Sequence, residues 1–231
     1  MAVRVFTGGG ALNSAVSSFS VNAQTPMTLM AWVYAVDSTV WSTTTSMVGA
    51  YGPGAAPATA IQIGSRGGTG LNVWTRGGTL LVSFTTHSPV AAWNHYAVTF
   101  NGTNTWLLYI NGVQVATGTT AQQAGNLTQT FVNGYPTGGT NESGNFAVDD
   151  AIFLSRQLSV DEIKTIYNVQ GPRDGVFQGV IARYTFDEGV IGNAVVTGKD
   201  ISSTGAHMTP TTGTAPVYYA PVAMCNVRRL P

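Results

Sequence analysis

The fold is decided by the stretch Trp93-Asn94-His95-Tyr96-Ala97-Val98-Thr99-Phe100, which places Tyr96, Val98 and Phe100 at every second position. Side chains of a β-strand alternate between its two faces, so this spacing predicts a strand with one face in a hydrophobic core. The chain continues with Asn101-Gly102, a second alternating run over residues 106–110, and Asn111-Gly112. Asn-Gly suits the two central positions of a type I′ turn. The order predicts consecutive antiparallel hairpins.

Similar short runs recur along the whole chain at intervals of about 8–12 residues, which is typical of a sandwich or barrel. The 231 residues include 28 glycines and 10 prolines, and only 9% of the residues are charged, against about 25% in an average soluble protein. This composition indicates an all-β protein rich in loops. Strands are predicted over Met27–Ala35, Ser46–Tyr51, Ala58–Gly64, Gly70–Thr75, Thr79–Phe84, Trp93–Asn101, Thr105–Asn111, Thr130–Tyr135, Asn145–Leu154 and Val180–Phe186.

One segment, Ser159–Asn168, has a helical pattern. It begins with the capping-box spacing, in which Ser159 and Glu162 satisfy each other's backbone N–H groups. Ile163, Ile166 and Tyr167 follow at helical spacing and form one apolar stripe. We expect a short helix that begins near Ser159 and lies on the sandwich.

Residues 189–231 form a Gly/Thr/Pro-rich tail behind a sandwich of residues 1–188. The run Val217–Met224 is apolar and uncharged, so we expect it to be buried. The tail either packs back on its own sandwich or reaches a neighbouring subunit, and its prolines favour the extended arm. The expected partner-contact residues are Tyr218, Tyr219, Arg228 and Arg229.

Four ordered motifs identify a family resemblance. They are Trp93–Gly102, Leu108–Val113, Phe146–Ala151 and Leu158–Ile163, preceded by the early core strand Met27–Tyr34. From about Val3 to Asn168 the chain resembles the laminin-G-like branch of the concanavalin A-like lectin/glucanase superfamily. The resemblance implies a jelly-roll sandwich of two antiparallel sheets.

A later segment, Ala182–Gly189, resembles the strand that normally begins such a domain. Two arrangements fit this order: the segment pairs back as a permuted strand, or it inserts into a neighbouring subunit. Residues 202–207 depart from the Ser-Gly-Asn-Gly run that is usual in the family.

The charge balance excludes several partners. Ten Lys and Arg residues balance ten Asp and Glu residues, whereas nucleic-acid binding needs clustered positive charge. No apolar run reaches the length of a membrane span, and the first residues lack a signal-peptide pattern. The single Cys225 forms no disulfide within the chain. We therefore expect neither a nucleic-acid nor a membrane partner.

A catalytic pair of carboxylates is not evident. Asp149-Asp150 and Asp187-Glu188 are adjacent on predicted strands, and adjacent strand residues face opposite sides. A glycosidase needs two carboxylates that face each other across the bond to be cleaved. No nucleophile elbow occurs either. We expect no catalytic residues and no enzyme activity.

Calcium is the one cofactor that the resemblance implies, with Asp149 and Asp150 as ligands at a sheet rim. The alternative is that Asp149 accepts backbone hydrogen bonds where the strand begins. The lack of an Asp-rich loop favours this alternative.

Sugar stacking is a further possibility for the aromatic residues. Trp32, Trp74, Trp93 and Trp106 lie on predicted strands and are assigned to the core. Trp41 lies in a polar run, and Tyr51 and Tyr135 lie beside prolines or glycines, so these three are the expected exposed ligand-binding residues.

The low charge and the long tail favour a non-enzymatic structural protein of a tailed-phage virion, as a capsid decoration or fibre-type component. Its expected partners are capsid or other virion proteins and further copies of itself, and its expected location is the virion. The alternative is a carbohydrate-binding, lectin-like adhesion module with a cell-surface glycan as partner. Fold by itself does not decide between them.

Overall fold

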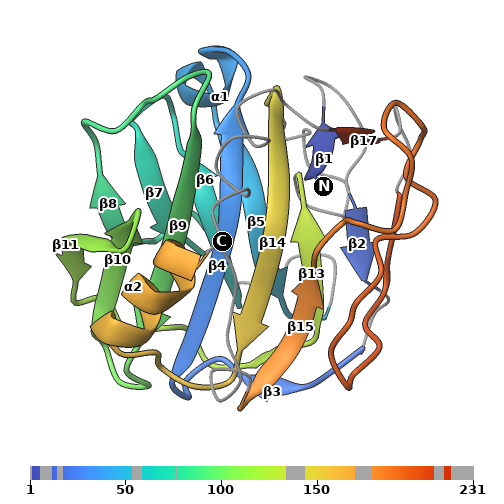
Figure 1. Cartoon of the computed structure of the whole chain (residues 1–231). Coiled ribbons are helices and arrows are strands. Elements are labelled where there is room, and N and C mark those ends of the chain that lie inside the picture. The colour runs from blue at the N-terminus through green and yellow to red at the C-terminus, as the bar shows by residue number, and fades with distance from the viewer. Residues whose placement is uncertain are drawn as a thin grey trace.

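The computed structural model of the chain describes residues 2–5, 12–14, 18–53, 59–75, 77–133, 144–169, 178–210 and 216–219. They form two large antiparallel sheets that pack face to face (Figure 1). The expected fold class, a two-sheet antiparallel jelly-roll sandwich, is confirmed.

The first sheet has eight strands in the order β11-β10-β9-β4-β14-β1-β17, and β15 also pairs with β14. These strands are β1 (Ala2–Val5), β4 (Met27–Ala35), β9 (Trp93–Phe100), β10 (Trp106–Ile110), β11 (Val113–Gly118), β14 (Phe146–Leu154), β15 (Val180–Tyr184) and β17 (Val217–Tyr219).

The second sheet has seven strands in the order β16-β2-β13-β5-β6-β7-β8. These strands are β2 (Leu12–Ser14), β5 (Thr45–Tyr51), β6 (Ala60–Ser65), β7 (Leu71–Trp74), β8 (Leu80–Phe84), β13 (Gln129–Val132) and β16 (Met208–Pro210). A two-residue pair, β3 (Val21–Asn22) with β12 (Asn126–Leu127), lies beside them. The two helices are α1 (Thr39–Ser42) and α2 (Val160–Val169).

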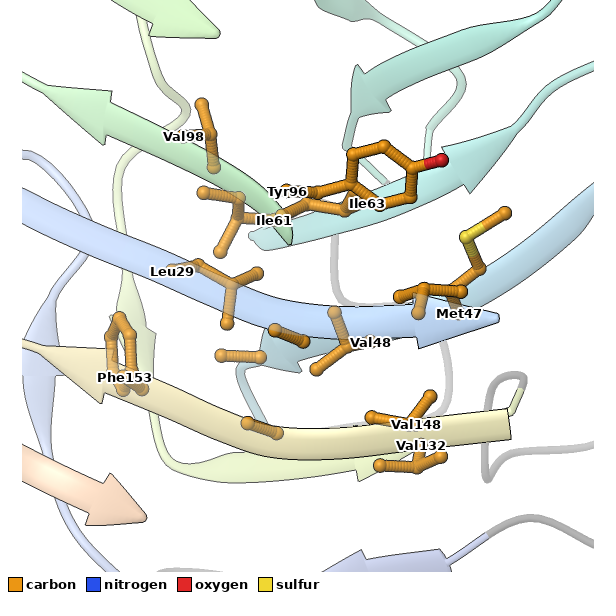
Figure 2. Packing of buried hydrophobic residues seen from close by; sticks show 14 of the residues in the cluster. Leu29, Met47, Val48, Ile61, Ile63, Tyr96, Val98, Val132, Val148 and Phe153 are labelled. Atoms are coloured by element: carbon orange, nitrogen blue, oxygen red, sulfur yellow. The ribbon is translucent and has the colours of Figure 1, made fainter. Parts of the chain in front are cut away.

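The hydrophobic core lies between the two sheets. Figure 2 shows Leu29, Val98 and Phe153 of the eight-stranded sheet facing Val48 and Ile61 of the seven-stranded sheet. All five are buried. The alternation of residues 96–100 therefore points into the core, as predicted.

The turn at Asn111-Gly112 has the predicted conformation, because φ is +51° at Asn111 and +78° at Gly112. Both values belong to the type I′ turn. The turn joins β10 to β11 in the register Ile110↔Val113.

The tail joins both sheets of its own chain. β15 pairs with β14, β16 with β2, and β17 with β1, so the sheets do not stop at residue 188. Single bridges join Ala194 to Val217, Gly198 to Met208 and Tyr184 to Asp200. The segment between these bridges runs along the side of the sandwich in Figure 1 (orange-red). It therefore covers edges that would otherwise offer unpaired backbone groups.

Asp200 organises the end of this segment. Its carboxylate accepts the backbone N–H groups of Arg183 (2.9 Å), Ser202 (2.8 Å) and Ala206 (2.8 Å). Burial acts to raise the pKa of Asp200, but these hydrogen bonds hold it below its ordinary value. Residues 202–206, which stand where the family usually has Ser-Gly-Asn-Gly, therefore form a turn around the Asp200 carboxylate.

Tyr218 was predicted to contact a partner, and the structure corrects this. Its side chain is buried in its own chain, and its hydroxyl donates to the Thr197 carbonyl at 3.2 Å. Strand pairing with β1 turns Tyr218 toward the core beside Val3. The backbone of Tyr219 belongs to β17, whereas Arg228 and Arg229 lie outside the described residues.

Candidate functional site

Aromatic side chains gather on the outer face of the eight-stranded sheet, which is the face that helix α2 covers (Figure 1). In the register of β4 and β9, Trp32 lies opposite His95 and Tyr34 opposite Trp93. Residues directly opposite each other share one face of a sheet. Tyr167 of α2 stacks on Trp32 from above. We call Trp32, Tyr34, Trp93, His95 and Tyr167 the aromatic face.

The rings of the aromatic face are in mutual contact. The centroids of Trp32 and Tyr167 are 5.6 Å apart with nearly parallel planes at 24°, and those of Trp32 and His95 are 5.3 Å apart. The Tyr34 and Trp93 rings form a second tilted pair at 5.6 Å. Trp32 and His95 are buried, but Tyr34, Trp93 and Tyr167 are half-buried. Trp32 and His95 therefore form the buried base of the aromatic face. Tyr34, Trp93 and Tyr167 form its partly exposed rim.

Helix α2 holds Tyr167 in place. As predicted, Ser159 Oγ accepts the Glu162 backbone N–H at 3.3 Å, and the Glu162 carboxylate accepts the Ser159 N–H at 2.8 Å. The Arg156 guanidinium donates to Glu162 at 2.7 Å, and this bond is the main cause that lowers the pKa of Glu162. Ile163 and Ile166 are buried against the sheet. The next residue along this stripe is Tyr167.

Two buried polar atoms of the aromatic face have no hydrogen-bond partner among the residues that the structure describes. They are Nδ1 of His95 and Nε1 of Trp93. A buried polar group without a partner costs about 1–3 kcal/mol. Burial also lowers the pKa of His95 to about 4, so its ring is neutral at pH 7. Both atoms could form hydrogen bonds with a ligand.

Asn111 fixes the backbone beneath this face. Its side-chain oxygen accepts the His95 N–H at 2.8 Å, and its side-chain nitrogen donates to Asn94 at 3.0 Å. A Cβ atom added at the neighbouring Gly112 would lie 3.2 Å from the Tyr167 ring. The Asn111-Gly112 turn therefore contacts both β9 and α2.

Asp149 and Asp150 adjoin the aromatic face, since Asp149 lies opposite Trp32. The pairing of β14 with β4 is irregular between Asp149 and Ile152, and Asp150 has φ +43°. The Asp149 carboxylate accepts the backbone N–H of Asp150 at 2.9 Å. The predicted alternative to metal binding placed such a bond where the strand begins, whereas Asp149 is the fourth residue of β14.

The calcium site that the resemblance implies does not fit these two residues. Both aspartates are buried, and the Arg183 guanidinium lies 3.6 Å from the Asp150 carboxylate. Calcium takes six to eight oxygen ligands. Among the described residues, no three His, Cys, Asp or Glu side chains are placed to hold a metal. Arg183 supplies the positive charge beside Asp150 instead.

The expected ligand-binding residues are not exposed. Trp41 is 5% exposed, because α1 buries it and its indole N–H donates to the Pro89 carbonyl at 2.7 Å. Tyr51 is 2% exposed and packs on Phe131. The expected exposure of these two rings was therefore wrong. Tyr135 lies outside the described residues.

Sequence reasoning assigned the rim of the aromatic face to the core. Trp93 is an odd-numbered residue of β9, whereas the core positions Tyr96, Val98 and Phe100 are even-numbered. The period of two thus predicts that Trp93 lies on the other face.

A protein-family model described as the concanavalin A-like lectin/glucanases superfamily matches residues 6–164, well over half of the chain. The chain belongs to this superfamily. The match includes the strands and the start of the helix that form the aromatic face. No curated protein sequence matches the chain.

Solved structures of the same fold come from several classes of protein. A candidate carbohydrate-binding protein from Bacteroides ovatus matches with a TM-score of 0.59 at 17% identity, over 91% of this chain and 60% of that one. A Trypanosoma rangeli sialidase in complex with sialic acid matches with 0.56 at 18% identity, over 73% of this chain and 28% of the sialidase. A SAP-like pentraxin from Limulus polyphemus matches with 0.53 at 12% identity, over 71% and 78%.

The sialidase matches correct one expectation. The absence of enzyme activity was inferred from the carboxylates, yet the fold of this superfamily member also occurs in sialidases. The chain spans less than a third of the length of those sialidases. At 18% identity the likeness shows the fold alone and assigns no reaction to this chain.

A membrane-spanning helix was not found in the part of the chain that the structure describes, where no helix is sufficiently long and apolar.

Proposed function

We propose that this chain is a lectin-like module that binds carbohydrate at the aromatic face. The observation that carries the proposal is the half-buried Tyr34–Trp93 ring pair beside two buried polar atoms that have no hydrogen-bond partner in the described part of the chain. A sugar ring has an apolar side and many hydroxyl groups. Aromatic rings offer a large apolar surface with polar edges, and ligand sites combine such surfaces with a few placed polar groups.

The two polar atoms differ in what they offer a ligand. The Trp93 indole nitrogen is a donor only, and neutral His95 has one ring nitrogen that donates and one that accepts. A hydroxyl can accept and donate at once. A sugar seated on the rim would therefore supply partners of both kinds after a small movement of the rings.

The comparisons support the proposal at the level of fold. The superfamily includes lectins by its description, and one protein of the same fold is a candidate for carbohydrate binding. Neither comparison identifies a sugar for this chain.

The test is a glycan screen with the purified full chain, followed by titration of the tightest glycan. We expect saturable binding that weakens at least about tenfold in Trp93→Ala, because a tenfold loss corresponds to 1.4 kcal/mol. Tyr34→Ala should weaken binding in the same direction.

Phe84→Ala is the matched control. Phe84 is a half-buried aromatic residue of β8 in the other sheet, so its loss should leave glycan affinity unchanged. Absence of any glycan binding would refute the function. Equal affinity of Trp93→Ala and Phe84→Ala would keep the function but refute the site.

We also propose a virion location for this module, as a capsid decoration or fibre-type component. The supporting observation is the 9% content of charged residues, since a surface partly covered by neighbouring subunits needs few charges for solubility. Mass spectrometry of purified virions from the source is the test. Detection of the chain in stoichiometric amount supports this location, and its absence refutes it.

A further inference from the structure

Left-handed backbone borders the aromatic face at three places. In the described part of the chain, five residues other than glycine have a positive φ, namely Ala91, Asn111, Asn133, Asp150 and Phe186. Residues with a side chain rarely adopt this conformation. Three of them, Ala91, Asn111 and Asp150, adjoin β4 or β9, the strands that carry four of the five rings of the face. Strained residues that gather around one site indicate that the site is held in shape for a ligand.

Ala91 is the exceptional member of this group, with φ +54°. Asn and Asp tolerate left-handed backbone because their short polar side chains form local hydrogen bonds, whereas the methyl group of alanine crowds the following carbonyl oxygen. The side chains of Val90, Ala91 and Ala92 are all exposed, so burial of apolar surface does not hold Ala91 in this conformation. We call residues 89–92 the rim turn, because Trp93 follows it directly.

Hydrogen bonds from three elements hold the rim turn instead. The Trp41 indole N–H of α1 donates to the Pro89 carbonyl at 2.7 Å. The Ala91 N–H donates to the Ala35 carbonyl, at the end of β4, at 2.8 Å. The Asn94 side chain of β9 donates to the last carbonyl of the turn at 3.3 Å. The backbone is thus fixed before, at and after Ala91.

Asn94 also links the rim turn to the second left-handed residue. Its side-chain oxygen accepts a hydrogen bond from the Asn111 side chain at 3.0 Å, and the Asn111 side-chain oxygen accepts the His95 N–H at 2.8 Å. In β9, Asn94 lies between Trp93 and His95, the residues whose buried polar atoms have no partner in the described part of the chain. The backbone that presents both atoms is therefore held by one chain of hydrogen bonds.

We propose that Ala91 is a positioning residue of the aromatic face. Its left-handed backbone sets the direction in which the chain enters β9, and it thereby fixes the Trp93 indole on the rim beside Tyr34. The inference rests on the proposed carbohydrate binding, because it names the residue that orients the ligand-binding ring. A ring that is already in place loses less freedom when a ligand binds, so the affinity is higher.

Ala91→Val tests the proposal in the full chain, with Ala92→Val as the matched control. Both changes add the same two methyl groups to exposed neighbouring residues, but only Ala91 has a positive φ, where a β-branched side chain is strongly disfavoured. We expect the affinity for the tightest glycan of the screen to fall at least about tenfold in Ala91→Val and to stay within about twofold in Ala92→Val. Ala91→Gly should keep the affinity, since glycine adopts this φ freely.

A measurement without ligand separates this inference from the proposed function. In a ¹H–¹⁵N spectrum of the free chain, the Trp93 indole N–H signal should move in Ala91→Val and stay in place in Ala92→Val and Ala91→Gly. If Ala91→Val folds poorly, Asn94→Asp tests the same hydrogen bonds. It removes the N–H that donates to the rim turn but keeps the oxygen that accepts from Asn111, and it should move the Trp93 signal as well.

The remaining outcomes are each decisive. Equal Trp93 signals and equal affinities in Ala91→Val and Ala92→Val would refute the positioning role, and so would a moved signal with unchanged affinity. An affinity loss in Ala91→Gly as large as that in Ala91→Val would mean that the methyl group, and not the left-handed backbone, is required. If no glycan binds the unmodified chain but the signal still moves in Ala91→Val alone, the proposed function fails while Ala91 still positions Trp93.

Discussion

The two faces of the eight-stranded sheet are both buried at its centre, but they differ in chemistry. On the inner face, Val98 and Phe100 pack among aliphatic and aromatic groups of the facing sheet. On the outer face, the same strand carries Trp93 and His95, each with a buried polar atom that lacks a hydrogen-bond partner among the described residues. Burial alone therefore does not distinguish a structural face from a binding face. We propose that the outer face is the binding face, because a ligand would satisfy the unpaired polar atoms of Trp93 and His95.

The largest expected effect is on the inner face. Phe100 and Trp106 stack with centroids 4.1 Å apart, and both are fully buried. Phe100→Ala should lower the free energy of unfolding by about 3–5 kcal/mol, because it removes apolar contacts and leaves a cavity. Urea denaturation measures this loss.

Tyr34→Ala provides the outer-face counterpart. Tyr34 is half-buried, so its truncation should cost clearly less than that of Phe100. If the two variants were equally destabilised, the proposed difference between the faces would be wrong.

The next effect concerns pH and His95. Burial lowers its pKa from 6.5 to about 4 in the folded chain. Between these two pH values His95 is therefore protonated in the unfolded chain but neutral in the folded chain. Stability therefore falls as the pH drops from about 6.5 to about 4, by roughly 3 kcal/mol from this group. Urea denaturation across this range is the measurement.

His95→Phe supplies the control for the pH effect. It keeps a ring between Trp32 and Tyr167 but cannot bind a proton. We expect a flatter dependence of stability on pH between 4 and 6.5. An unchanged dependence would show that other groups cause the loss.

A smaller effect is expected at the helix that covers the outer face. Ser159→Ala removes the hydroxyl that accepts the Glu162 N–H, and loss of such a cap costs about 1 kcal/mol. Thermal unfolding measures the change, with the exposed Ser203→Ala as control. A decrease no greater than that of the control would mean that the capping box contributes little to α2.

Local patterns predicted much of this fold. The bounds of β4 were predicted without error, and β9 and α2 were predicted to within one residue because their spacing and cap signals agree. The four-residue helix α1 was missed, since a single turn has no periodicity to detect. That helix buries Trp41, which is why a polar sequence neighbourhood gave the wrong exposure.

The candidate site was harder to predict for two physical reasons. β4 is apolar on both faces, so its sequence does not tell which of Trp32 and Val33 faces the core. The aromatic face also joins β4, β9 and α2, which lie far apart in the sequence, and no local pattern encodes contacts between them. Tyr167 reaches the aromatic face only through the packing of α2 on the sheet.

The indole N–H signals in a ¹H–¹⁵N spectrum test the central claim most directly. The five tryptophans give separate signals, and substitution of each by Phe assigns them. Trp41 and Trp106 donate to backbone carbonyls of Pro89 and Thr120, so they serve as internal references. We predict that the Trp93 signal shifts saturably when the selected glycan is added, while the Trp41 and Trp106 signals stay in place. Saturable glycan binding with an unmoved Trp93 signal would contradict the assignment of the aromatic face as the binding site.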